Sequence, residues 1–295
     1  MIFTGSGVAL VTPFSDNAVN YTQLQALIEW HINAGTQALI ILGTTGEGVT
    51  LSTAEKKEVF TQAVRFAKRR IKIIANTGSN DTAASIELSL FAQKIGADGL
   101  LLVCPYYNKP SQRGLIAHFT AIADAVDIPC ILYNVPGRTS VNLTAESCCA
   151  LAQHPRIVGV KEASHDLAQI DTIIKHAPKG FAIYSGNDDQ NEAILALGGH
   201  GVISVTGNLI PERLAAFCTA RLKGNALEAK AMHEGMMPLH TVLFIESNPV
   251  PAKAALNQMG HPVGSVRLPL VELEPQNALK LRTVLIHQGL VTEES

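Results

Sequence analysis

The sequence predicts an α/β protein, a (β/α)8 TIM barrel with a C-terminal helical appendix. Three observations support this prediction. Eight short apolar runs recur between residues 8 and 205, segments with helical periodicity separate them, and no strand-like run follows residue 224. A length of 295 residues suits one barrel of this kind. A doubly wound open sheet stays an alternative, because it has the same alternation of strands and helices.

The eight apolar runs are each of strand length and almost uniformly hydrophobic. That pattern is typical of parallel strands covered on both faces. The segments between these runs carry helix signals. Ser52 and Glu55 form a capping-box pattern that opens one helix, and Gly96 marks the end of another helix, which precedes it in the sequence. The predicted strands are residues 8–11, 38–42, 71–74, 99–103, 130–132, 157–160, 181–184 and 202–205.

The C-terminal part carries helical patterns interrupted by prolines. We predict a barrel catalytic domain over residues 1–224 and a helical domain over residues 225–295. The predicted C-terminal helices are residues 226–236, 240–245, 252–259 and 277–289.

The amino-acid composition indicates what the protein can bind. Charged residues make up 16% of the chain and hydrophobic residues 47%, so we expect part of the surface to be buried in a homo-oligomer. The net charge of −2 and the absence of a long basic run argue against nucleic acid. No apolar stretch approaches the roughly 18 to 20 residues that span a bilayer. We expect a cytoplasmic protein whose five cysteines stay reduced.

Polar residues follow the predicted strands. In a parallel barrel the carboxyl ends of the strands meet at one face, where active sites form. These ends are followed by residues 43–47, 105–107, 133–138, 161–162 and 185–188.

Lys161 directly follows the apolar run 157–160. Burial at the rim of an apolar barrel favours an uncharged, nucleophilic amine that can form a Schiff base with a carbonyl compound. Tyr133 follows the neighbouring strand and could move the proton that this chemistry requires. A lysine that reaches water or pairs with Glu162 is the structural alternative.

The turn Gly43-Thr44-Thr45-Gly46-Glu47-Gly48 lacks the features of a P-loop or a dinucleotide fingerprint. Its backbone N–H groups suit a carboxylate, although a tight turn would need the same glycines. Arg138 suits bidentate carboxylate recognition. No histidine pattern indicates a metal site, and we expect no metal and no cofactor.

Four motifs together resemble the dihydrodipicolinate synthase family over essentially the whole chain. They are Gly43–Glu47, Tyr133–Thr139, Val158–Glu162 and Gly198–Ser204, and the segment that contains Asn248-Pro249-Val250-Pro251 adds to the resemblance. The wider superfamily also includes N-acetylneuraminate lyase and keto-deoxy-sugar aldolases. Arg138 after the Tyr-Asn-Val-Pro-Gly stretch favours the synthase.

The resemblance implies a condensation of pyruvate with L-aspartate 4-semialdehyde in diaminopimelate and lysine biosynthesis. It implies an imine between Lys161 and pyruvate. It also implies a tetramer formed as a dimer of dimers, or a dimer. The implied proton relay is Tyr133, Thr44 and a Tyr107 from the neighbouring subunit, and the implied substrate-binding residues are Thr45, Arg138, Gly186 and the Ile203 backbone.

Two other functions stay open at this point. One is a keto-acid aldolase or lyase that uses the same imine, and the other is a catalytically silent barrel that binds a keto acid. The resemblance also implies an L-lysine cleft in sensitive members of the family. This chain has Ala84 where those members have a carboxylate, and Thr53 and Lys56 where they have histidines, so we expect weak or no inhibition by L-lysine.

Overall fold

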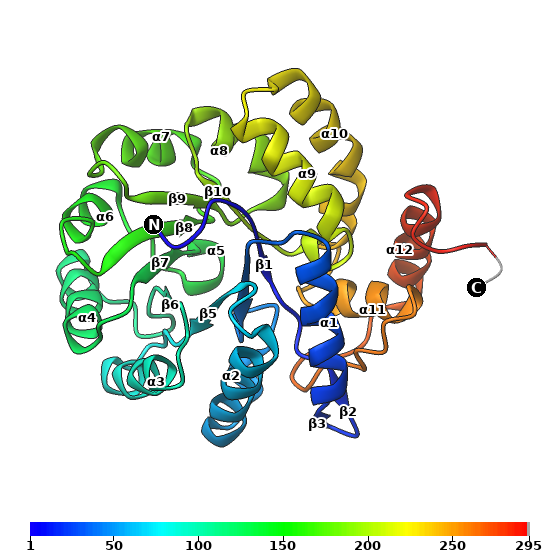
Figure 1. Cartoon of the computed structure of the whole chain (residues 1–295), viewed down its shortest axis with the longest axis horizontal. Coiled ribbons are helices and arrows are strands. Elements are labelled where there is room, and N and C mark those ends of the chain that lie inside the picture. The colour runs from blue at the N-terminus through cyan, green and yellow to red at the C-terminus, as the bar shows by residue number, and fades with distance from the viewer. Residues whose placement is uncertain (294–295) are drawn as a thin grey trace.

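A closed barrel of eight parallel strands forms the centre of the protein (Figure 1). The structure is a computed structural model that describes residues 1–293. The predicted TIM barrel is therefore confirmed, and the open-sheet alternative is wrong. In their order around the barrel, the strands are β1 (Gly5–Ala9), β10 (Gly201–Ser204), β9 (Ala182–Ser185), β8 (Ile157–Glu162), β7 (Cys130–Asn134), β6 (Gly99–Val103), β5 (Lys72–Asn76) and β4 (Ala38–Ile41).

Helices surround the barrel and follow its strands. A small hairpin, β2 (Phe14–Ser15) with β3 (Ala18–Val19), precedes the first helix. The α-helices up to residue 222 are α1 (Tyr21–Asn33), α2 (Thr53–Ala67), α3 (Thr82–Lys94), α4 (Gln112–Ala125), α5 (Pro136–Thr139), α6 (Ala145–Leu151), α7 (Leu167–His176), α8 (Asn191–Leu197) and α9 (Pro211–Leu222). Short 3-10 helices are η1 (Gly48–Thr50), η2 (Asp188–Gln190) and η3 (Thr206–Asn208).

The apolar side chains form two layers, as expected for strands that are covered on both faces. One cluster fills the barrel and includes Ile40, Leu101 and Ile131. The other lies between the strands and the helices and includes Leu39, Leu100 and Leu132. Successive residues of a strand thus belong to different layers, which explains why the sequence shows continuous apolar runs.

The first strand begins earlier than predicted. The prediction of residues 8–11 is wrong at both ends, since β1 spans Gly5–Ala9. Its first residues are small and do not form an apolar run. At Gly7 the reason is the close approach of β10, because a Cβ there would lie 2.9 Å from the Val202 carbonyl oxygen. Two other strands end later than predicted. At their carboxyl ends, β7 and β8 extend beyond the apolar runs to include Tyr133 and Lys161.

Between residues 225 and 293 the structure contains three helices, α10 (Ala226–Val242), α11 (Val250–Gln258) and α12 (Pro275–His287). The predicted helices 226–236 and 240–245 are largely one helix, α10, with Pro238 inside it, so the predicted break is wrong. Packing of the buried residues Met236, Leu239 and His240 outweighs the backbone bond that the proline removes. The domain boundary after residue 224 stays a prediction.

The predicted start of one barrel helix and the predicted end of another are confirmed. Ser52 and Glu55 form the reciprocal capping box at the start of α2, and Gly96 has the positive φ of 88° expected just after α3.

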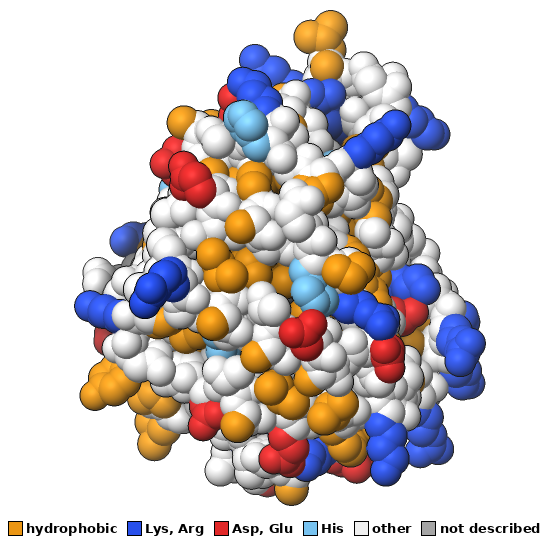
Figure 2. Space-filling view, turned by 90° about the vertical axis from the view of Figure 1, so that its left-hand side faces the viewer, with side chains coloured by type: hydrophobic (Ala, Val, Ile, Leu, Met, Phe, Trp, Pro, Cys, Tyr) orange, Lys and Arg blue, Asp and Glu red, His pale blue; other side chains and the backbone are white. Residues whose placement is uncertain are grey.

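Hydrophobic side chains are also present on the surface. Figure 2 shows them in several patches between scattered Lys, Arg, Asp and Glu side chains. The most exposed large ones include Tyr107, Val49 and Leu268. Within residues 1–293, no helix has the length and apolar character needed to cross a membrane. The cytoplasmic location stays a prediction.

Candidate active site

Lys161 lies near the carboxyl end of β8 and extends into the barrel. Its side chain is only 5% exposed. Its Nζ atom makes a cation–π contact with the Tyr133 ring, whose centroid lies 4.3 Å away. The two residues are direct partners in the β7–β8 register. No carboxylate among residues 1–293 pairs with the amine. A buried amine without a counter-charge is costly to the fold and is typical of a reactive lysine.

Glu162 belongs to the other face of β8. Its carboxylate accepts hydrogen bonds from Asn134 and Ser164 in the layer between the strands and the helices. The Lys161–Glu162 ion pair, one form of the structural alternative, is therefore wrong. The 5% exposure of Lys161 argues against the other form, a lysine that reaches water. Burial is the largest influence on this group and raises the pKa of Glu162 to about 7, while its hydrogen bonds oppose the rise.

A small cavity of about 50 Å³ lies around Lys161. It collects residues from most of the strand ends predicted to form the site. Its lining includes Thr44, Thr45, Tyr133, Arg138, Lys161 and Gly186 from the predicted site, together with Ala9, Ile40, Gly43, Leu101, Val135, Ala163, Asn187, Val205, Phe244 and Asn248.

The turn after β4 forms one wall of this cavity. Thr45 is buried, and its hydroxyl oxygen accepts a hydrogen bond from Asn248 Nδ2 at 2.9 Å. Glu47 adopts a positive φ of 52° and is fully enclosed. Gly48 is required because a Cβ there would lie 2.3 Å from the Leu42 carbonyl oxygen. The turn is therefore tightly folded, with Thr44 and Thr45 facing the site.

Gly186 has a specific steric reason to be glycine. A Cβ at this position would lie 2.9 Å from the Glu162 carbonyl oxygen and 3.0 Å from Lys161 Cε. Asn187 follows Gly186 and also lines the cavity. Asp188, the residue after it, points elsewhere, since its carboxylate accepts hydrogen bonds from the Val205 and Thr206 backbone. Gly186 thus leaves space for the amine, and Asp188 supports the loop after β10.

Arg138 and Tyr107 are the exposed members of the predicted set. Arg138 lies on the short helix α5 and borders the cavity. Its guanidinium has no hydrogen-bond or ion-pair partner within residues 1–293. Tyr107 is 89% exposed with a φ of 71°, and it does not line the cavity. Ile203 is fully buried inside the barrel and is also absent from the lining.

The comparisons with known proteins give one answer. A sequence model of the dihydrodipicolinate synthetase family matches residues 2–288. The chain belongs to this family. The 4-hydroxy-tetrahydrodipicolinate synthase of Thermoanaerobacter sp. (strain X514) is 51% identical over 293 residues and covers 99% of both chains. The predicted family and the prediction of an enzyme are therefore confirmed.

Solved structures of the family agree with the fold along its whole length. The chloride-inhibited dihydrodipicolinate synthase of Acinetobacter baumannii, complexed with pyruvate, has a TM-score of 0.96 at 44% identity, with 98% of this chain and 99% of that chain covered. The enzyme of Cyanidioschyzon merolae with lysine bound has a TM-score of 0.96 at 41% identity, with coverage of 98% and 99%.

Sequence reasoning missed one polar residue of the cavity. Asn248 lines the cavity and bonds to Thr45, but the sequence showed it only as part of a proline-rich segment. Its position in front of two closely spaced prolines was the available signal, and that signal is weak. For metals, residues 1–293 contain no cluster of three or more His, Cys, Asp and Glu side chains able to hold an ion.

Glu162 generates a prediction about pH. Its pKa is raised from 4.5 to about 7 in the folded chain, so the neutral form is favoured by folding. The stabilisation is fully present below about pH 4.5 and is lost as the pH rises through 7. Glu162→Gln removes this titration. As the pH rises from 4.5 to 8, the unfolding free energy of the parent should therefore fall by up to about 3 kcal/mol more than that of the variant.

Urea unfolding at a fixed protein concentration and a series of pH values measures this difference. Glu228→Gln, at an exposed position of α10, is the matched control and should follow the parent. Parallel pH curves for the parent and Glu162→Gln would contradict the prediction.

Proposed function

We propose that this chain is a 4-hydroxy-tetrahydrodipicolinate synthase that condenses pyruvate with L-aspartate 4-semialdehyde. The observation that supports this most directly is the buried, unpaired Lys161 amine beside the Tyr133 ring. An amine in this state can attack a keto acid without first losing a bound counter-ion. The printed names of the family relatives point to the same activity.

In the proposed reaction, Lys161 Nζ attacks the C2 carbonyl of pyruvate and water leaves, which forms the imine. Loss of a C3 proton gives the enamine, and its C3 attacks the aldehyde carbon of the semialdehyde. The amino group of the added part then replaces Lys161 at C2, which closes the ring and frees the enzyme. Each step moves a proton, so an acid–base group must stand beside the amine.

The family resemblance gives each site residue a proposed role, and the positions of Tyr133, Thr44, Thr45, Gly186 and Arg138 around the cavity support theirs. Tyr133, whose ring lies beside the amine, exchanges protons with it, and Thr44 and a Tyr107 from a neighbouring subunit continue the proton relay. Thr45 and the Ile203 backbone hold the pyruvate carboxylate, and Gly186 leaves room for the bound intermediate. Arg138, which has a free guanidinium at the mouth of the cavity, binds the semialdehyde carboxylate in a bidentate manner.

The experiment that tests this function combines trapping and turnover. With borohydride, pyruvate should form one adduct, on the peptide that carries Lys161, and Lys161→Ala should form none. Pyruvate should be consumed only when L-aspartate 4-semialdehyde is present. Mass spectrometry and a coupled assay measure the two results. An adduct without consumption, together with cleavage of a sugar keto acid, would instead indicate an aldolase.

We propose that Tyr107 acts in the site of a neighbouring subunit within a homo-oligomer. The support is its position: it is 89% exposed, yet its backbone has a positive φ that is unusual for a bulky residue. Val49 and Leu268 are also highly exposed, as expected of side chains that a second subunit covers.

Mixed oligomers test the position of Tyr107. Tyr107→Phe and Tyr133→Phe should each lower turnover by roughly 10²- to 10⁴-fold, because each removes a proton-transfer group. Tyr107→Phe should still form the pyruvate adduct. Mixing the two proteins should restore part of the activity, since one site in a mixed dimer has both tyrosines. No recovery despite measured subunit exchange would place both residues in one chain's site.

We also propose that L-lysine inhibits this enzyme weakly or not at all. A cavity of about 450 Å³ beside the active site is lined by Thr53, Lys56, Ala84 and Tyr106. Two carboxylates also line it, but each is already paired: Glu87 with Lys57 at 2.8 Å, and Glu47 with Lys253 at 2.9 Å. The ammonium of a bound lysine would therefore lack a free partner.

Activity titrated with L-lysine tests this proposal. The parent should keep most of its activity at submillimolar L-lysine, because a missing charge-assisted hydrogen bond weakens binding by roughly ten- to a hundredfold. Ala84→Glu should increase the sensitivity. Strong inhibition of the parent would imply that another group in the cavity binds the ammonium.

A further inference from the structure

The turn with Thr44 and Thr45 is attached to the C-terminal segment by buried polar contacts. Asn248 Nδ2 donates to Thr45 Oγ1 at 2.9 Å, and Lys253 Nζ donates to Glu47 Oε1 at 2.9 Å. These contacts join residues that lie 203 and 206 positions apart in the sequence. The geometry of this wall of the active site thus depends on α11 and on the residues just before it.

The hydrogen bond from Asn248 determines the direction in which the Thr45 hydroxyl proton points. A threonine hydroxyl has one proton to donate and lone pairs to accept with. Because an amide N–H occupies a lone pair of Thr45 Oγ1, the Thr45 proton points away from Asn248. Thr45 makes no hydrogen bond as a donor to any group in residues 1–293. Its proton is therefore available to an oxygen atom of a ligand in the cavity.

Asn248 itself is incompletely satisfied. It is 5% exposed, lines the Lys161 cavity, and its Oδ1 atom has no hydrogen-bond partner in the part of the chain that is described. A buried acceptor without a partner costs stability, so such an amide needs a reason other than folding. A side chain that only filled this space could be apolar.

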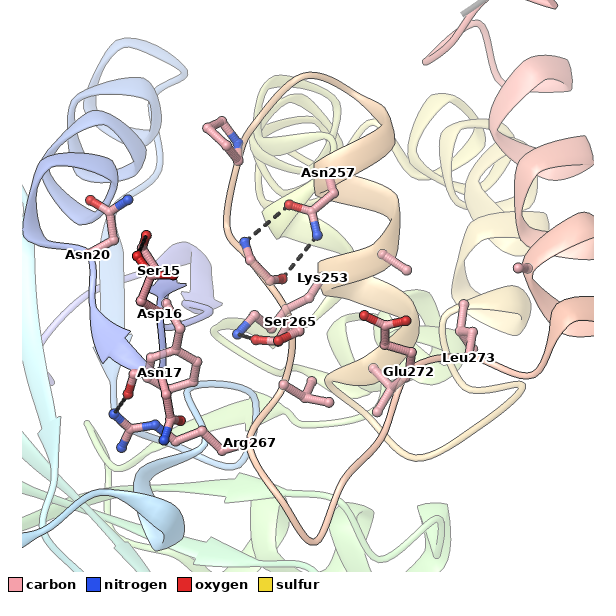
Figure 3. Close-up of a pocket in the computed structure, with 17 residues that line it drawn as sticks. Ser15, Asp16, Asn17, Asn20, Lys253, Asn257, Ser265, Arg267, Glu272 and Leu273 are labelled. Carbon is pink, nitrogen blue, oxygen red and sulfur yellow. Dashed lines mark hydrogen bonds between the residues drawn. The ribbon is translucent and has the colours of Figure 1, made fainter.

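The contact of Lys253 holds the turn in place around Thr45. Its ammonium lies over the Phe14 ring, 4.1 Å from the centroid, and also donates to the Ser265 carbonyl oxygen at 2.6 Å. Figure 3 shows Lys253 at the wall of a neighbouring cavity, facing Ser265, with Arg267 below it. The Arg267 backbone N–H donates to the second oxygen of Glu47 at 2.8 Å. Both oxygens of Glu47 are thus held from the C-terminal side.

We infer that Asn248 is a positioning residue, which directs the Thr45 hydroxyl proton toward the carboxylate of the bound keto acid. The inference rests on the proposed function, because it takes pyruvate as the ligand. Asn248 acts through Thr45 and need not contact the reacting atoms. Its loss should therefore weaken the use of pyruvate much more than the chemistry at saturating pyruvate.

Two substitutions test the direction of the bond. Asn248→Ala removes the donor and should raise the pyruvate KM about tenfold. Asn248→Asp has nearly the same shape, but its carboxylate would accept the Thr45 proton and repel the substrate carboxylate, so its KM should rise further. In both variants kcat should change less than KM. Asn33→Asp, at the exposed end of α1, is the matched control and should leave both constants unchanged.

A double-mutant cycle shows whether Asn248 acts through Thr45. Thr45→Val alone and Thr45→Val with Asn248→Ala should have the same pyruvate KM, because the amide has nothing left to position. Additive effects, or a pyruvate KM within twofold of the parent in both Asn248 variants, would overturn the inference. Thermal unfolding of every variant identifies any loss that comes from misfolding.

Borohydride trapping separates this inference from the proposed function. If the parent forms no adduct with pyruvate, the function itself fails. If the parent forms the adduct and the Asn248 variants show the same dependence of trapping on pyruvate concentration, only the role of Asn248 fails. A shifted dependence with full trapping at high pyruvate is the expected result.

Discussion

The active site depends on the alternation of side chains along β8. Lys161 and Glu162 are adjacent in sequence, yet one lies inside the barrel and the other lies among the helices. A slip of one residue in the register would exchange them. The pairing of Lys161 with Tyr133 on one side and Tyr184 on the other fixes that register. With the carboxylate inside, the amine would lie among the helices, and the barrel would have no nucleophile for a keto acid.

The same alternation explains how much the sequence could predict. Parallel strands bring their carboxyl ends to one face, so residues that follow different apolar runs converge without any further information. Thr44, Tyr133 and Lys161 met around one cavity for this reason. The start of β1 was missed because strand prediction relied on apolar side chains. Gly7 instead leaves room for the Val202 carbonyl of β10, and Gly5 has a positive φ of 100°.

Asn248 could not be predicted as a site residue in this way. It follows no strand, and its contact with Thr45 depends on how the C-terminal helices pack against the barrel. Helical periodicity predicts that such helices have a buried face, but it does not predict which loop that face meets. The break wrongly predicted within α10 has the same origin, since tertiary packing there outweighed the local effect of Pro238.

The buried pair of Lys253 and Glu47 is better explained by geometry than by stability. Both side chains are 1% exposed, and removing two charges from water costs about as much free energy as their attraction returns. An apolar pair of similar size could fill the same space. Glu47, however, holds a left-handed backbone conformation with φ of 52°, which an ordinary side chain adopts only when surrounding contacts impose it. The bonds from Lys253 and from the Arg267 backbone impose it from outside the barrel. Thr45, two residues earlier, is thereby held where Asn248 can reach it.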